Sequence, residues 1–236
     1  QEHTTVVELA PKHRKLYDTV LQRERKKLLG LIKDMDRNRF IVFRSLTLLR
    51  MLALDPAIVD AEEYGDIPSS KLDGLLDNLG EVVAEGHRVI VFSQFTSFLA
   101  RVAARLDEAG IDHAYLDGAT RDRDGAISGF KEGSAPVFLI SLKAGGFGLT
   151  LTEADYVFLL DPWWNPAAEA QAIDRTHRIG QTKNVMVYRM VSENTIEEKV
   201  LALQRKKAEL FTALMDNGSA FSEALTADDV RDLLGG

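Results

Sequence analysis

Two short, continuous apolar runs, each followed at once by a polar break, constrain the fold of this chain more than any other feature. They occupy residues 137–140 and 156–160, and the breaks begin at Ser141 and Asp161. Apolar runs of this length are typical of strands that are buried on both faces of a parallel sheet. Ligands of open α/β sheets bind beyond the carboxyl ends of the strands. The two breaks therefore mark the edge where we expect a functional site.

Further short strands flank these two runs, and amphipathic segments separate them. The strands are expected at residues 88–92, 114–116 and 184–190. Leucine and phenylalanine at helical spacing predict helices between the strands, most of them closed by glycine or a polar turn. Strands and helices that alternate at this rhythm predict an α/β fold with a right-handed parallel sheet.

The polar break at Asp161 leads into a predicted helix that carries cations. Asn165 is the expected N-cap, and Pro166 is the expected first helical residue. If the helix continues, Gln171, Arg175 and Arg178 stand at positions i, i+4 and i+7 and share one face. A guanidinium group is always charged and binds phosphate oxygens in pairs, so two arginines on one ridge indicate a polyanion, with a nucleoside triphosphate as the obvious candidate.

These residues belong to two recognisable blocks, DPWWNP at 161–166 and QAIDRTHRIGQ at 171–181. The blocks resemble motifs V and VI of superfamily-two helicase-like motors, in the form found in Swi/Snf-type DNA translocases. Residues 93–96 and 117–120 resemble earlier blocks of the same ordered set. The resemblance implies the second RecA-like lobe of such a motor, a parallel sheet with helices on both faces, together with an N-terminal helical protrusion.

The resemblance also divides the chain into segments. It implies a remnant strand of the preceding lobe at 1–10, the helical protrusion at 11–60, a linker at 61–70, the RecA-like lobe at 71–215 and a tail with a short helix at 216–236. A strand cut from its own sheet loses its partners. We therefore expect residues 4–9 to be frayed or paired with the edge of another chain.

Site residues follow from the resemblance, position by position. Arg175 and Arg178, with Gln171, are the implied catalytic residues, because arginines at these positions stabilise charge on a nucleotide held by the opposite lobe. Glycines let backbone N–H groups approach an anion, and the implied nucleotide contacts are Gly146, Gly148 and Asp174. The implied contacts to the DNA backbone are Ser93, Gln94, Gly118, Thr120, Ser141, Lys143, Ala144, Gly145 and Trp164. Residue composition leaves two interpretations of the paired indoles, a face presented to DNA or packing at the rim of the sheet.

A nucleotide cradle is missing from the sequence. A nucleoside triphosphatase of this kind needs a GxxxxGK[ST] loop and a carboxylate for Mg²⁺, and the chain contains no such loop. The acidic sequence at residues 107–110 is expected at the end of a helix, which is the wrong context for that carboxylate. We therefore expect ATP with Mg²⁺ to be bound mainly by a first lobe. The full-length protein is expected to be a DNA-dependent ATPase, and this chain alone is expected to be inactive.

Charge and composition set the remaining expectations. Residues 1–50 hold 12 Lys+Arg and 6 Asp+Glu, a net +6, and the rest hold 17 and 30, a net −13. The absence of cysteine excludes disulfides and thiolate zinc sites, and scattered histidines make a metal site unexpected. Expected partners are double-stranded DNA, the first lobe, and RNA polymerase or another DNA-bound complex, with no membrane. The expected location is the cytoplasm, in association with the nucleoid, if the protein is bacterial, and the nucleus if it is eukaryotic. The alternative function is a non-catalytic module that docks on DNA or a polymerase.

Overall fold

The computed structural model describes residues 1–144, 149–207 and 224–235, and these form two compact units. One, here called the sheet unit, comprises Gln1–Val6, Lys71–Asp161 and Ala168–Val191. The other, the helical unit, comprises Val7–Ser70, Pro162–Ala167 and the described residues from Ser192 onward. No helix among the described residues combines the length and the apolar composition needed to cross a membrane.

Six strands form the sheet, in the order β1-β6-β5-β2-β4-β3. Their bounds are Glu2–Val7 for β1, Val89–Ser93 for β2, His113–Leu116 for β3, Val137–Ser141 for β4, Tyr156–Leu159 for β5 and Met186–Ser192 for β6. β2 lies between β4 and β5 and is parallel to both, with Val89 opposite Val137 and Tyr156. Every residue of β2 and β4 is buried, which explains their unbroken apolar sequences.

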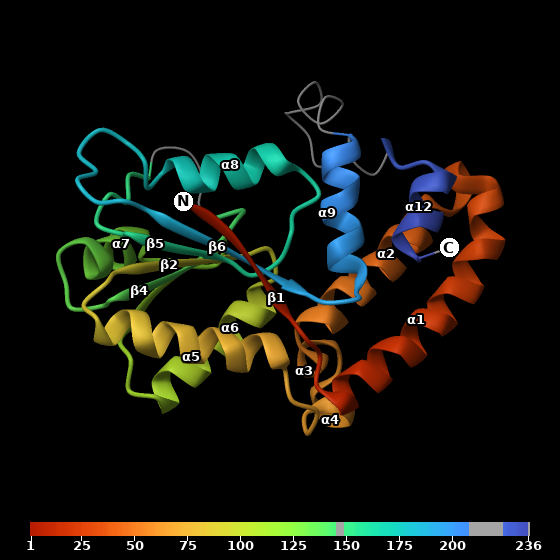
Figure 1. Cartoon of the computed structure of the whole chain (residues 1–236), viewed down its shortest axis with the longest axis horizontal. Helices are drawn as coiled ribbons and strands as arrows, with labels where there is room; N and C mark the ends of the chain where they lie inside the picture. Colours follow the sequence, from red (N-terminus) through yellow and green to blue (C-terminus); the bar gives the residue numbers. More distant parts are fainter. Residues whose placement is uncertain (145–148, 208–223, 236) are drawn as a thin grey trace. The chain divides into compact units, whose positions relative to one another are not determined.

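Helices cover both faces of this sheet, as the sequence predicted. α5 and α6 lie on one face and α8 lies on the other (Figure 1). The bounds are Ser70–Ala84 for α5, Thr96–Glu108 for α6, Arg123–Lys131 for α7 and Pro166–Asp174 for α8. α6 buries Phe98, Leu99, Val102 and Leu106, whose helical spacing turns one apolar stripe toward the strands. The α/β fold class is confirmed.

The first strand is part of this sheet, which corrects one expectation. The Gln1 carbonyl accepts a hydrogen bond from the Val187 N–H at 2.8 Å, and the Val7 carbonyl accepts one from the Glu193 N–H at 2.8 Å. The prediction that residues 4–9 are frayed or paired with another chain is therefore wrong. The physical reason is that β6 has an edge of unpaired backbone groups, which β1 satisfies within the same chain.

The helical unit joins helices from both ends of the chain around one core. Its elements are α1 at Pro11–Leu31, a 3₁₀ turn at Ile32–Asp34, α2 at Met35–Leu54, α3 at Pro56–Val59, α4 at Ala61–Tyr64, α9 at Ile196–Lys206 and α12 at Ala227–Leu233. Buried side chains of α1, α2, α9 and α12 form the core, for example Tyr17, Leu49, Val200 and Val230. This grouping differs from the sequence-based boundaries, which put α9 in the lobe and residues 216–236 in a tail.

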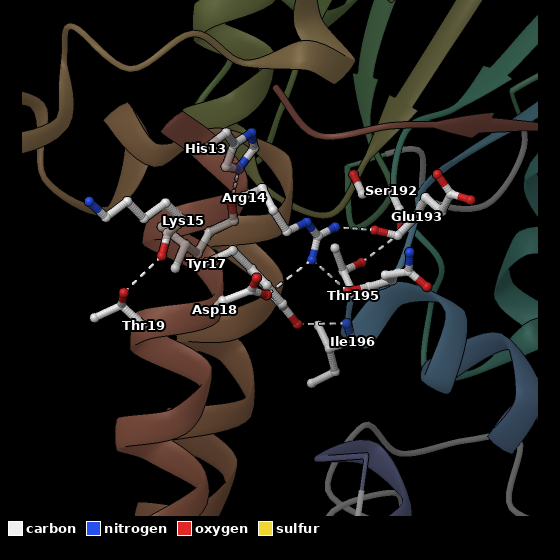
Figure 2. A network of polar contacts seen from close by, with 12 residues as sticks. His13, Arg14, Lys15, Tyr17, Asp18, Thr19, Ser192, Glu193, Thr195 and Ile196 are labelled. Atoms are coloured by element: carbon white, nitrogen blue, oxygen red, sulfur yellow. Dashed lines mark hydrogen bonds and ion pairs between the residues drawn. The ribbon is translucent and has the colours of Figure 1, made fainter. Parts of the chain in front are cut away.

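Polar contacts from α1 hold the start of α9 in place (Figure 2). The Tyr17 hydroxyl accepts a hydrogen bond from the Ile196 N–H at 2.7 Å, and burial raises the pKa of this phenol. Arg14 donates to the carbonyls of Glu193 and Asn194, the second at 2.9 Å. The first N–H groups of a helix lack partners within the helix, so α1 supplies an acceptor that α9 itself does not have.

Removing this acceptor gives a first testable prediction. Tyr17→Phe leaves the Ile196 N–H buried without its partner, and we expect the variant to lose about 1–3 kcal/mol of unfolding free energy. Thr19→Ala is the control, because the Thr19 hydroxyl bonds the Lys15 carbonyl on the exposed side of the same helix. Urea unfolding measures both variants, and an equal small effect would show that the Tyr17 contact does not stabilise the unit.

Candidate functional site

Asp161 organises the carboxyl ends of two neighbouring strands. It directly follows the apolar run of β5 and its side chain is buried. The Ser93 hydroxyl donates to Asp161 Oδ1 at 2.5 Å, and the Gln94 N–H donates to Asp161 Oδ2 at 3.1 Å. Ser93 is itself fully buried. The predicted site residues Ser93 and Gln94 are therefore held by a carboxylate that sequence reasoning did not assign to the site, although its place after a buried strand was the available signal.

The loop after β4 continues this edge. The Leu142 N–H donates to the Ser93 carbonyl at 3.1 Å, and the Ala144 N–H donates to the Ser141 hydroxyl at 3.2 Å. Ser141 and Ala144 are buried, whereas Lys143 is exposed, so Lys143 is the side chain of this turn that is presented to solvent. The predicted residues Gly145, Gly146 and Gly148 lie outside the described residues.

One arginine that the sequence did not single out bonds this loop. Arg123 at the start of α7 donates to the Ala144 carbonyl at 2.8 Å. The loop that precedes the glycines is thus fixed both to β2, through Ser93, and to α7. A guanidinium group beside a candidate anion-binding loop adds positive charge where phosphate oxygens are expected.

The turn after β3 is bonded within itself. The Asp117 N–H donates to the Thr120 hydroxyl at 2.9 Å, and the Ala119 N–H donates to Asp117 Oδ1 at 2.8 Å. Burial would raise the pKa of Asp117, but hydrogen bonds from Ala119, Tyr115 and Thr120 hold it below its usual value. Burial and the neighbouring Asp117 raise the pKa of Tyr115 to about 12. Gly118 is exposed at the tip, so an anion could reach its backbone.

The helix with the predicted arginine ridge is shorter than expected. α8 ends at Asp174, so only Gln171 and Asp174 lie on it, both exposed. The N–H and hydroxyl of Thr176 both donate to the Ile173 carbonyl, at 3.0 and 2.6 Å, which closes the helix with a tighter turn. The prediction that Gln171, Arg175 and Arg178 share one helical face is therefore wrong. Arg175 and Arg178 instead lie in the turn that follows α8.

This arginine turn still places two cations near each other. Burial and the positive charge of Arg178 lower the pKa of Arg175. Arg175 is half-buried, whereas Arg178 is exposed and its side chain makes no hydrogen bond or ion pair with residues that the structure describes. Two like charges held close repel each other, and an anion bound between them would relieve that repulsion.

The arginine turn is joined to the exit of the glycine loop. The Leu151 N–H donates to the Arg175 carbonyl at 3.1 Å, and Gln181 Nε2 donates to the Ala154 carbonyl at 2.9 Å. Gly180, near the end of the turn, has a φ of 106°, a conformation that favours glycine. The segment that begins at Leu151 and the arginine segment are separate in the sequence, and they meet at Leu151 and Arg175.

A buried ion pair fixes α8 on the sheet. Glu169 of α8, whose side chain is 2% exposed, pairs with Arg189 of β6. Arg189 also lies 3.8 Å from the carboxylate of Glu2 in β1. Glu169 is thus engaged by Arg189, so this ion pair orients the helix that leads to Arg175 and Arg178.

Trp164 belongs to the core of the helical unit. Its side chain is 8% exposed, packs against Phe43 at 6.0 Å between ring centroids, and lies 4.8 Å below the guanidinium of Arg50. Arg50 also donates to the Pro162 carbonyl at 3.0 Å. Burial makes Trp164 a packing residue in this structure rather than an exposed surface for DNA, which corrects the interpretation that favoured a DNA contact.

The groups that the site exposes are mainly cations and backbone N–H groups. Among the residues that the structure describes, no three His, Cys, Asp or Glu side chains gather closely enough to hold a metal ion. The strand ends present the side chain of Lys143 and the backbone of Gly118, and the arginine turn carries two guanidinium groups. These are the groups that bind phosphate oxygens in proteins.

Comparison with known proteins relates the chain to helicase-like proteins. The family described as "Helicase conserved C-terminal domain" matches residues 70–180. The chain is 44% identical over 168 residues, 69% of its length, to DNA repair protein RAD5 of Cryptococcus neoformans. It is 37% identical over 232 residues, 96% of its length, to an uncharacterized ATP-dependent helicase of Mycoplasma pneumoniae. The chain spans only 14% and 22% of these two relatives.

A solved structure supports the same relationship. The Sulfolobus solfataricus SWI2/SNF2 ATPase core in complex with double-stranded DNA is similar with a TM-score of 0.73 and 26% identity. That similarity covers 98% of this chain and 49% of the solved one. Family match, relatives and fold therefore agree. The chain belongs to the Swi/Snf family of helicase-like proteins, as their C-terminal, RecA-like lobe.

Proposed function

We propose that this chain is the second motor lobe of an ATP-dependent translocase that moves along double-stranded DNA. The observation that carries the proposal is the arginine turn, in which the charge of Arg178 acts on Arg175 and the Arg175 carbonyl accepts a hydrogen bond from the Leu151 N–H. The DNA complex of the similar Sulfolobus protein and the relatives described as helicases support the same assignment.

The proposed division of work follows from the groups that this lobe offers. ATP with Mg²⁺, bound mainly by a preceding lobe, would supply the phosphoryl group whose transfer to water drives movement. Arg175 and Arg178 would approach the phosphate oxygens and stabilise the charge that develops during transfer. Lys143, Gly118 and the backbone of the strand-end loops would hold the phosphates of one DNA strand.

Movement in this proposal comes from opening and closing of the cleft between two lobes. Because the Arg175 carbonyl is bonded to the Leu151 N–H, a shift of Arg175 toward the nucleotide would also move the segment that begins at Leu151, close to the proposed DNA contacts. The preceding lobe and double-stranded DNA are thus the proposed partners. A DNA-bound complex such as RNA polymerase is a further partner proposed from the family resemblance alone.

A reconstitution experiment tests the proposal. We expect this chain alone to hydrolyse no ATP above background, because it lacks a phosphate loop. Adding a separately produced first lobe, or joining the two in one protein, is expected to produce turnover that DNA stimulates. Hydrolysis by this chain alone would contradict the assignment of roles. DNA binding without any turnover in the two-lobe protein would favour the alternative, a docking module.

A further inference from the structure

Helix α1 carries a solvent-facing row of cations that the strand-end site does not use. At 100° per residue, five basic residues of α1 fall within an arc of about 120° that contains no acidic residue. We call them the α1 basic face, and they are Lys12, Lys15, Arg23, Lys26 and Lys27.

The packing of α1 fixes the direction of this face. The opposite side of the helix buries Tyr17 and Leu28 in the core of the helical unit. All five residues of the α1 basic face are exposed. A row that begins at Lys12 and ends at Lys27 extends over about 22 Å at 1.5 Å per residue. The cations therefore form a continuous, outward-facing band along the helix rather than a scattered surface charge.

Three of these cations have no counter-ion in the described structure. Arg23 and Lys27 flank the buried carboxylate of Glu24, at 3.2 and 3.4 Å. Lys12, Lys15 and Lys26 make no ion pair with any residue that the structure describes. The face thus keeps an excess of positive charge in a chain whose net charge is −7.

The composition of the face indicates what kind of partner it fits. Protein interfaces need buried apolar anchors, and Leu16, the apolar side chain within the arc, is half-buried against the core. A row of amino groups without apolar anchors suits a regular polyanion, and duplex DNA offers one phosphate charge per about 1.7 Å of its axis. We propose that the α1 basic face is a second DNA contact, made by the helical unit to the phosphate backbone. The proposal rests on the proposed function in taking DNA as the partner.

A salt titration of DNA binding tests this inference. The variant Lys12→Gln, Lys15→Gln, Lys26→Gln removes the three unpaired amino groups and leaves the core of the unit untouched. Each lost phosphate contact lowers the slope of log Kd against log salt by about 0.9, so we expect the slope to fall by about 2.7 between roughly 50 and 200 mM salt. Fluorescence anisotropy of a labelled duplex measures the slope for this chain.

A matched variant controls for net charge. The control variant removes three exposed cations from α9 in the same unit by the substitutions Lys199→Gln, Arg205→Gln and Lys206→Gln. We expect its slope to change by less than about 0.9, the value of one phosphate contact. Equal slopes for the two variants would overturn the inference, as would the absence of duplex binding by this chain. Stronger loss of binding to polyglutamate than to DNA would assign the face to an acidic protein instead. If the α1 variant lowers the slope as expected but the two-lobe protein hydrolyses no ATP, only the proposed motor function would be contradicted.

Discussion

Replacing Arg175 or Arg178 with alanine is expected to lower DNA-stimulated ATP turnover of the two-lobe protein by about a thousandfold or more. The physical reason is that a guanidinium group supplied to the transferring phosphate stabilises the charge that develops there. Lysine at either position is expected to restore little, because an ammonium group lacks the planar fork that binds two phosphate oxygens. Turnover at saturating ATP and DNA measures the effect.

The matched control is Arg105→Ala. Arg105 lies in α6 and makes an exposed pair with Asp73 at 3.1 Å, so its loss is expected to leave turnover within about twofold. DNA binding should be nearly unchanged in the Arg175 and Arg178 variants, since their proposed partner is the nucleotide. A tenfold or smaller loss of turnover in both variants would remove the arginine turn from the catalytic machinery.

Breaking the ion pair beneath α8 is expected to have the second largest effect. Arg189→Met removes the Arg189 guanidinium from the carboxylate of Glu169, which is 2% exposed. Removal of one member of a buried pair costs about 3–5 kcal/mol of unfolding free energy, and we expect a loss in that range. Because α8 leads directly into the arginine turn, ATP turnover of the two-lobe protein should fall as well.

A double variant separates the burial of a charge from the position of the helix. Glu169→Leu combined with Arg189→Met removes both charges, and most of the lost unfolding free energy should return. Glu2→Gln is the control, since its carboxylate is exposed and 3.8 Å from Arg189, and we expect less than about 1 kcal/mol. If the double variant were as unstable as Arg189→Met, an uncompensated Glu169 charge would not be the cause.

The strands at the centre of the sheet were predictable because their environment is nearly uniform. β2 and β4 are buried along their whole length, so their sequences are continuous apolar runs that local inspection can find. The polar residues that end these strands were predictable for the same reason. Ser93 and Ser141 lie opposite each other at the carboxyl ends of β2 and β4.

The end of α8 was not predictable from residue spacing. Arg175 and Arg178 continue a helical pattern, and no proline or glycine separates them from Gln171. The helix stops because the Leu151 N–H bonds the Arg175 carbonyl and because Thr176 bonds Ile173, three residues back. The first of these contacts depends on a partner that is 24 positions away in the chain. The helical pattern therefore predicted correctly that Arg175 and Arg178 lie near each other, but it predicted a helix where the backbone forms a turn.

Sequence alone determined the strands, the order of the motif blocks and the family, because each depends on residues that lie close together in the chain. Only the tertiary structure decided which distant segments share a core or a sheet edge. It paired β1 with β6, placed α9 and α12 with the N-terminal helices, and buried Trp164 beneath Arg50. The physical reason is that apolar surface and open strand edges select partners by shape and proximity in space, and a linear pattern does not specify those partners.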